Sequence, residues 1–157
     1  MVDKNDLIIT ARLRENARET LTKMSRKTYI PVTTIHGRIK ELEKTVIKRY
    51  VALLDFQKLG YNTRAIINLR VKKDFKDKIR DYLVVNKAVN SLYKINNGYD
   101  FLMEVVFREI GDVESFVENL ENDFKIEKKE IYYIINEINK ECFLSKYDYV
   151  RLTGSID

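Results

Sequence analysis

Apolar residues in the first third of the chain recur at the three- and four-residue spacing of amphipathic helices. This spacing predicts helices over residues 6–15, from about 19 to a break at 28–31, and over 32–44. The break contains Pro31, which disfavours helical geometry at the residue before it and suits the first turn of the helix that follows. We therefore expect three short helices, with a tight turn before the third.

The third of these helices has two chemically different sides. Ile35, Ile39 and Leu42 form one narrow apolar stripe. The opposite side is small, polar and basic, and carries Thr33, Gly37, Lys40 and Lys44. Such a helix packs on one side and can enter the major groove of DNA with the other, so the last two helices predict a helix-turn-helix. A plain three-helix bundle is the alternative.

From residue 47 onward, apolar residues follow the alternation typical of β-strands, interrupted by two helical stretches. The expected elements are a linking strand over 47–55, a strand over 63–72, a helix over 74–85, strands over 89–95 and 101–107, a helix over 112–123 and a strand over 126–138. Asn97-Gly98, between the two central strands, is a strong hairpin signal. After the linking strand the order is β-α-β-β-α-β, a ferredoxin-like unit whose helices cover one face of the sheet. The other face lacks a covering layer, which predicts a homodimer.

The predicted fold class is α+β. It consists of an N-terminal, winged-helix-like helix-turn-helix domain of three helices and a ferredoxin-like βαββαβ dimerisation domain. We place the DNA-binding domain at 1–50, a linker strand and hinge at 51–61, and the dimerisation domain at 62–141. Residues 142–157 are a C-terminal extension to which the pattern assigns no role.

Charge is distributed unevenly along the chain, whose net charge is +5. Residues 1–50 contain 12 Lys or Arg against 6 Asp or Glu, whereas residues 51–157 contain 17 against 18. A basic module attached to a neutral one favours binding to a polyanion, and double-stranded DNA is the partner that we expect. A merely solvated basic surface is the alternative.

Other classes of protein are disfavoured by what the sequence lacks. No apolar run approaches the roughly 20 residues of a membrane span, and the first ten residues do not resemble a signal peptide, so we expect a cytoplasmic location and no membrane contact. The single cysteine, Cys142, and the single histidine, His36, cannot assemble an intramolecular disulfide or a Cys/His metal site. We expect Cys142 to be a small packing residue near the end of a strand, and we expect no metal or cofactor.

Several motifs together are typical of one family. They are ENAR at 15–18, VTTIHGRIKELE at 32–43, VIKRYVALLDFQKLGY at 46–61 and NNGYD at 96–100. Through these motifs, in collinear order from residue 3 to about 140, the chain resembles the leucine-responsive and asparagine-synthetase regulators (Lrp/AsnC, or feast/famine regulators). The resemblance implies a DNA-binding regulator whose βαββαβ domain dimerises, with assembly to a tetramer or octamer as further alternatives. It also implies an amino acid or similar effector beside a Gly-x-Asp turn, here Gly98-Tyr99-Asp100.

Two residues depart from the family pattern at the helix-turn-helix. Tyr29 stands where the family has glycine, and Pro31 stands near the usual position of a capping serine. Tyrosine enters the left-handed conformation at a higher cost than glycine, so we expect a wider turn, and Pro31 removes a capping hydroxyl.

The DNA-binding residues are expected in two groups. Base edges should meet Thr33, Thr34, His36 and Gly37 in the first turns of the third helix. Phosphates should meet the surrounding cations Lys27, Lys40, Lys44, Lys48 and Arg49. Arg38 lies beside the apolar stripe, where it either reaches a phosphate or pairs with an acid of the same domain. Asp100 either holds the amino group of an effector or bonds its own backbone, as Asp in turns often does.

Two alternative functions belong to other classes. One is an architectural protein that binds DNA of any sequence. The other follows from relatives of similar outline that resemble tetrapyrrole decarboxylases. Since the only histidine lies on the third helix, the second domain has little equipment for acid/base chemistry, and we do not expect an enzyme.

Overall fold

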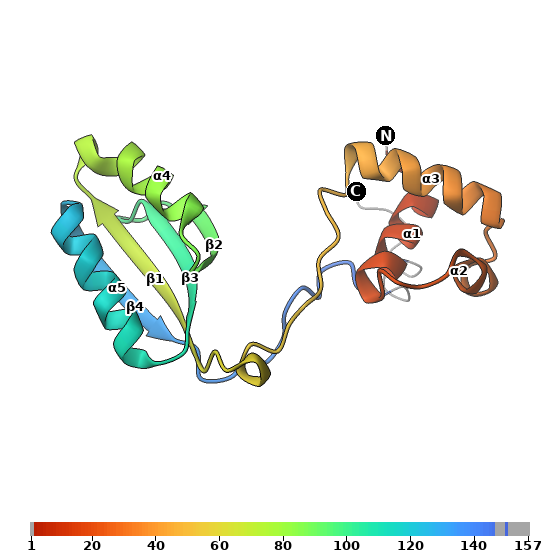
Figure 1. Cartoon of the computed structure of the whole chain (residues 1–157). Coiled ribbons are helices and arrows are strands. Elements are labelled where there is room, and N and C mark those ends of the chain that lie inside the picture. The colour runs from red at the N-terminus through yellow and green to blue at the C-terminus, as the bar shows by residue number, and fades with distance from the viewer. Residues whose placement is uncertain (1, 147–149, 151–157) are drawn as a thin grey trace. The chain divides into compact units, whose positions relative to one another are not determined.

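The computed structural model describes residues 2–146 and residue 150, and the chain forms two compact units. The first unit comprises residues 1–52 together with 138–157, and the second comprises residues 53–137. The chain therefore passes from the first unit to the second and returns (Figure 1). None of the helices in the described part of the chain is long and apolar enough to span a bilayer.

Within residues 2–146, the helices of the first unit are α1 (Lys4–Glu15), α2 (Leu21–Thr28) and α3 (Val32–Thr45). Asp3 and Asp6 form a reciprocal capping box that fixes the start of α1, and the Thr20 hydroxyl accepts a hydrogen bond from the Lys23 N–H at the start of α2. The core consists of apolar side chains from all three helices and from the segments that flank them. Its buried members are Ile8, Ile9, Ala11, Met24, Ile30, Ile35, Leu42 and Val150.

The end of the described chain belongs to this first unit. Val150 is only 4% exposed and Leu144 packs against the same core. The Arg14 guanidinium donates to the Glu141 carbonyl oxygen at 2.9 Å and to its carboxylate at 3.0 Å. In this division the residues from Ile138 onward group with the helical unit, whereas the sequence analysis placed residues up to 141 in the dimerisation domain.

The second unit is a four-stranded antiparallel sheet with two helices on one face (Figure 1). Its elements are β1 (Thr63–Val71), α4 (Lys76–Val85), β2 (Val89–Lys94), β3 (Phe101–Phe107), α5 (Ile110–Asp123) and β4 (Ile126–Tyr133), with 3₁₀ turns at Gln57–Leu59 and Lys73–Phe75. The strand order β2-β3-β1-β4 is that of the ferredoxin-like arrangement, so the predicted order of elements is confirmed.

Alternation along the strands places the core between the sheet and the helices. In β1, Ala65, Ile67 and Leu69 are fully buried, and they pack with Ile79 of α4 and Leu120 of α5. The intervening β1 side chains point to the opposite face of the sheet, which neither α4 nor α5 covers.

Three sequence expectations are corrected here. Residues 47–55 contain no strand: Ile47 packs partly against the helical core, whereas residues 48–55 are exposed and pair with none of the strands that the structure describes. The last strand ends at Tyr133 rather than near 138, since β1 offers no ladder beyond Arg64. Cys142 is exposed in a loop, where its Sγ contacts the Asn139 side chain, and it is not a packing residue.

Candidate nucleic-acid interface

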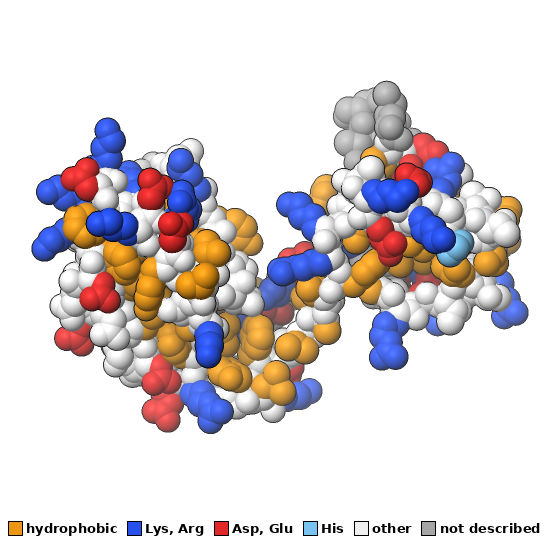
Figure 2. Space-filling view, turned by 45° about the horizontal axis from the view of Figure 1, so that its top comes forward, with side chains coloured by type: hydrophobic (Ala, Val, Ile, Leu, Met, Phe, Trp, Pro, Cys, Tyr) orange, Lys and Arg blue, Asp and Glu red, His pale blue; other side chains and the backbone are white. Residues whose placement is uncertain are grey.

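The start of α3 offers a polar surface on a firmly packed helix. Thr33, Thr34, His36 and Gly37 are all exposed. Ile35 and Leu42 are buried and hold the opposite side of the helix against α1 and α2. A side chain added at Gly37 would meet no atom within 4 Å, so nothing in this unit blocks close approach there. Figure 2 shows the single histidine in pale blue beside Lys and Arg side chains on this unit.

The turn before α3 is tight although a tyrosine occupies it. Tyr29 adopts the left-handed conformation, with φ 59° and ψ 19°, and its N–H donates to the Ser25 carbonyl oxygen at 2.8 Å. The expectation of a wider turn was wrong, because it assumed that tyrosine would avoid this conformation. The ring is 91% exposed. Pro31 precedes the first helical residue, and no side chain caps α3, as the sequence predicted.

The cations predicted to flank this surface differ in whether they form an ion pair with an acid of the same unit. Lys40, Lys48 and Arg49 are exposed. Lys44 pairs with Glu41 at 2.8 Å on the surface, and Lys27 lies 3.3 Å from the Glu19 carboxylate. Sequence reasoning missed three further exposed cations before and on α2, namely Arg18, Lys23 and Arg26. Their position on or just before α2 was the available signal, because the first helix of a helix-turn-helix crosses the DNA backbone.

Arg38 is engaged within its own unit. Its Nη1 donates to Asp3 Oδ2 at 2.6 Å and to Asp6 Oδ1 at 2.8 Å. Of the two roles considered for this residue, the structure contains the pairing with acids of the same domain. The contact fixes α3 against the start of α1.

A buried ion pair joins α1 to the segment before α2. Arg12 donates to Glu19 through Nε at 2.8 Å and Nη2 at 2.5 Å, and both side chains are at most 6% exposed. The hydrogen bonds from Arg12 are the largest influence on the Glu19 carboxyl and lower its pKa, against the opposing effect of burial. Sequence reasoning missed this pair, because the charges lie seven residues apart across a loop.

The Gly98-Tyr99-Asp100 turn is held through Asp100, which contacts Lys76 of α4 and Val71 of β1. Asn97 and Gly98 both have positive φ, as the Asn-Gly signal predicted. Burial alone would raise the pKa of Asp100, but hydrogen bonds from Lys76 and from the Val71 N–H, the latter at 2.9 Å, lower it. The carboxylate is therefore already bound by its own chain.

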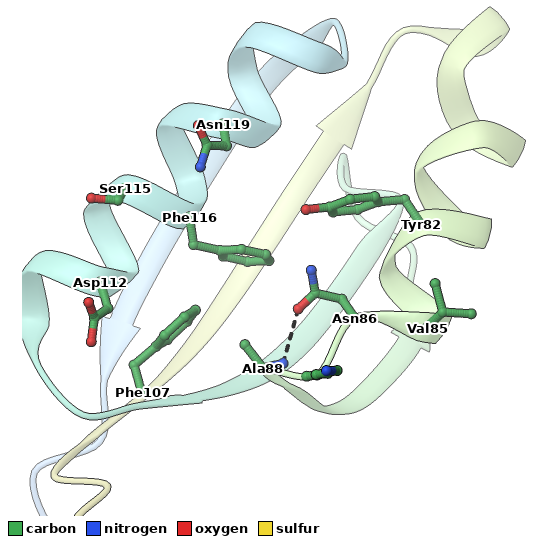
Figure 3. A pocket seen from close by; sticks show the side chains of 10 residues that line it. Tyr82, Val85, Asn86, Ala88, Phe107, Asp112, Ser115, Phe116 and Asn119 are labelled. Carbon is green, nitrogen blue, oxygen red and sulfur yellow. Dashed lines mark hydrogen bonds between the residues drawn. The ribbon is translucent and has the colours of Figure 1, made fainter.

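A separate hollow of about 580 Å³ lies between α4 and α5. Figure 3 shows the rings of Tyr82, Phe107 and Phe116 directed toward the space between the two helices. Asn86 and Asn119 add side-chain amides, and the side-chain Oδ1 of Asn86 accepts a hydrogen bond from the Ala88 N–H at 3.0 Å. No residue of the Gly98-Tyr99-Asp100 turn lines this hollow. The second unit thus has two separate places where a small molecule could contact it.

Comparisons with known proteins agree with this architecture. No family model matches the chain. An HTH-type transcriptional regulator of Pyrococcus furiosus is 30% identical over 143 residues, which cover 90% of this chain and 96% of that protein. The HTH-type transcriptional regulator FL11 of the same organism is 28% identical over 119 residues, covering 75% and 79%.

Solved structures share the fold at lower identity. A Neisseria meningitidis transcriptional regulator in complex with L-methionine has a TM-score of 0.81 at 22% identity, over 89% of this chain and 94% of that one. Escherichia coli AsnC has a TM-score of 0.79 at 19% identity, over 89% and 96%. With its helix-turn-helix, its βαββαβ unit and these relatives, the chain belongs to the Lrp/AsnC family of HTH-type transcriptional regulators.

Proposed function

We propose that this regulator reads double-stranded DNA in a sequence-specific manner with the start of α3. The observation that carries the proposal is the exposed group Thr33, Thr34, His36 and Gly37 on a helix whose other side is buried, with no acidic residue in its first turn. Hydroxyls and an imidazole can bond base edges, and the absence of a side chain at Gly37 allows close approach to the groove floor.

The surrounding cations bind phosphates in this proposal. The predicted set is Lys27, Lys40, Lys44, Lys48 and Arg49, and we add the exposed cations Arg18, Lys23 and Arg26. Arg38 is assigned a positioning role, since its bonds to Asp3 and Asp6 hold α3 in place. Replacing one phosphate-binding cation with Ala should weaken binding to all sequences alike and reduce the salt slope by about one.

Gly37→Glu is the decisive test of the α3 assignment. The added carboxylate has space in the protein but would lie in the negative potential of the groove. Gly111→Glu is the matched control, since Gly111 is also an exposed helical glycine with no atom within 4 Å of an added Cβ. Binding sites are first selected from random DNA, and mobility shifts then compare the selected site with random sequence.

Gly37→Glu should lose its affinity for DNA, whereas Gly111→Glu should bind DNA as wild type does. Changes at Thr33 or His36 should alter the preferred base at roughly 1–3 kcal/mol per lost contact. Equal binding by Gly37→Glu and wild type would disprove the assignment. Equal affinity of wild type for selected and random DNA would favour an architectural protein instead.

The regulator acts as a homodimer through the sheet face opposite the helices. Ile66, Leu102 and Val106 lie on this face, and Tyr132 on the neighbouring strand is more than half exposed. A second copy would cover these side chains and leave the α4/α5 side in solvent. Sedimentation of the full chain should show at least a dimer, and Leu102→Glu should yield a folded monomer. A wild-type monomer at micromolar concentration would refute this interface.

An amino acid or similar small effector binds the second unit. The family resemblance and the L-methionine complex of one structural neighbour support this class of ligand. The Gly98-Tyr99-Asp100 turn is the first candidate site, and the α4/α5 hollow is the second because aromatic rings and amides converge on it.

Both candidate sites are tested by measuring the melting temperature of wild type and variants with and without each common amino acid. The quantity compared is the ligand-induced increment, because Asp100→Ala also removes the contacts to Lys76 and Val71. Loss of the increment in Asp100→Ala assigns the turn, and its loss in Asn119→Trp, which fills the hollow, assigns that site. Absence of any shift in wild type would show that no common amino acid is the effector.

A further inference from the structure

One arginine contacts both segments of chain that join the two units. The entering segment covers residues 53–62, before β1, and the leaving segment covers 134–137, after β4. The Arg64 Cζ lies 5.6 Å from the centroid of the Phe56 ring on the entering segment. Its Nη1 donates to the Glu137 carboxylate on the leaving segment at 2.7 Å.

The same guanidinium is anchored in the sheet. Arg64 donates to Glu104 Oε1 of β3 through Nε at 3.1 Å and Nη2 at 2.6 Å. Glu104 also accepts from the Asn90 side chain of β2 at 2.8 Å. The Arg64 and Glu104 side chains are 17% and 10% exposed, so this part of the pair is shielded from solvent. We call Arg64, Glu104, Glu137 and Phe56 the Arg64 clamp.

Two of the clamp residues, Phe56 and Glu137, lie within a few residues, along the chain, of the points where the chain leaves the first unit and re-enters it. Glu137 directly precedes Ile138, where the chain re-enters the first unit, and only residues 53–55 separate Ala52 from Phe56. Beyond residue 138 the leaving segment is fixed to the helical unit by the contacts of Glu141 and Leu144. Without the clamp, the β-ladder would hold the chain from Thr63 up to Ile134, whose N–H donates to the Arg64 carbonyl oxygen at 2.9 Å, and the entering segment would keep the contact of the Tyr61 ring with Arg108 at 5.6 Å.

We propose that the Arg64 clamp determines the spacing of DNA half-sites that the regulator accepts. This inference rests on the proposed function. In a dimer each recognition helix must meet its own half-site, and the length of free chain between the DNA-binding unit and the dimer core decides how far that helix can shift. Each freed residue adds up to about 3.5 Å of reach, roughly the rise of one base pair. Arg64 is therefore a positioning residue that acts on spacing and not on base identity.

The structure offers matched controls for each arm of the clamp. Arg70 lies six residues further along β1, on the same face, and pairs with Glu127 at 3.1 Å, remote from both joining segments. Arg64→Ala is therefore compared with Arg70→Ala, and Glu137→Gln with Glu127→Gln. The Glu137 side chain is 42% exposed, so Glu137→Gln removes the outer arm without leaving a buried charge. Arg64→Lys keeps the charge but not the forked geometry.

The experiment measures affinity of the full-length protein for two selected half-sites at varied separation and for a single half-site. Wild type should lose at least about tenfold in affinity when the separation changes by half a helical turn, about five base pairs. Arg64 and Glu104 lie on the sheet face of the proposed dimer, so the comparison uses variants that sediment as wild type does. In these, Arg64→Ala and Glu137→Gln should reduce this loss to about threefold or less, with Arg64→Lys intermediate, while the two control variants keep the wild-type profile. Affinity for a single half-site should stay within about twofold in every variant.

The outcomes separate two failures. If Glu137→Gln and Arg64→Lys keep the wild-type spacing profile, or if wild type shows no spacing preference although it binds the half-site, the clamp inference is wrong and the DNA-binding function stands. If wild type does not distinguish the half-site from random DNA, the proposed function itself fails.

Discussion

The buried Arg12–Glu19 pair should make a large contribution to the stability of the DNA-binding unit. Glu19→Gln removes the negative charge and leaves the Arg12 guanidinium buried beside a neutral amide. Breaking a buried pair from one side typically costs 3–5 kcal/mol. Arg12 retains Glu15 at 2.5 Å, and Gln can still accept one hydrogen bond, so we expect a loss at the lower end, about 3 kcal/mol.

The loss of stability in Glu19→Gln should depend on pH, and the direction of this dependence follows from the pKa of Glu19. The pKa of Glu19 is lowered in the folded chain from its ordinary value of 4.5, so its contribution is fully present above pH 4.5 and disappears as the pH falls through the folded value. The stability gap between wild type and Glu19→Gln should therefore be largest at neutral pH and shrink in acid.

Hydrogen exchange of the amides of α1 and α2 measures this gap in the intact protein, because it reports the opening of the first unit apart from the second. Glu41→Gln is the control: Glu41 pairs with Lys44 on the surface, where both side chains are about 70% exposed, and its loss should cost less than about 0.5 kcal/mol. Arg12→Met combined with Glu19→Gln should be less destabilised than the two single changes added together. A cost for Glu19→Gln as small as that for Glu41→Gln, or a gap that persists unchanged in acid, would refute the reasoning.

Three further substitutions test the backbone conformation at single residues, with stability measured by urea unfolding. Gly37→Ala should stabilise the first unit by about 0.8–1 kcal/mol, since the site is helical and open, and any destabilisation would contradict the free space found there. Tyr29→Gly should be more stable than Tyr29→Ala by about 1 kcal/mol, because only glycine adopts the left-handed conformation without cost, and equal stabilities would argue against a left-handed turn. Gly98→Ala should destabilise the second unit by about 1 kcal/mol, given its φ of 85°, with Gly111→Ala as a control that should not.

Where a pattern of residues reflects burial, the sequence was informative. The bounds of β3 were predicted as Phe101–Phe107 and are confirmed, because the alternation of its side chains matches a face packed under two helices. The recognition helix was also predicted within one residue at each end, since Ile35 and Leu42 define a stripe that only a helix can bury on one side.

Where the outcome depends on a partner distant in the sequence, the pattern failed. Residues 47–55 alternate like a strand, yet Val51 and Leu53 are about 60% exposed, because a strand requires a neighbour and none of the strands among the described residues pairs with this segment. Arg38 was correctly placed beside the apolar stripe, but the choice between phosphate and acid depended on Asp3 and Asp6, more than 30 residues earlier. The sequence shows where each charged residue lies, but it does not show which acid and base form an ion pair in the fold.

The return of the chain to its first unit has a consequence for biosynthesis. Residues 4–45 contain α1, α2 and α3, but the core that these helices form also contains Leu144 and Val150. A ribosome that has made the helix-turn-helix has therefore not yet supplied the side chains that complete its core, and must first synthesise the whole sheet unit. The helical unit is thus finished only after the whole sheet unit has been synthesised, so a prematurely terminated chain would carry α3 on an incomplete core.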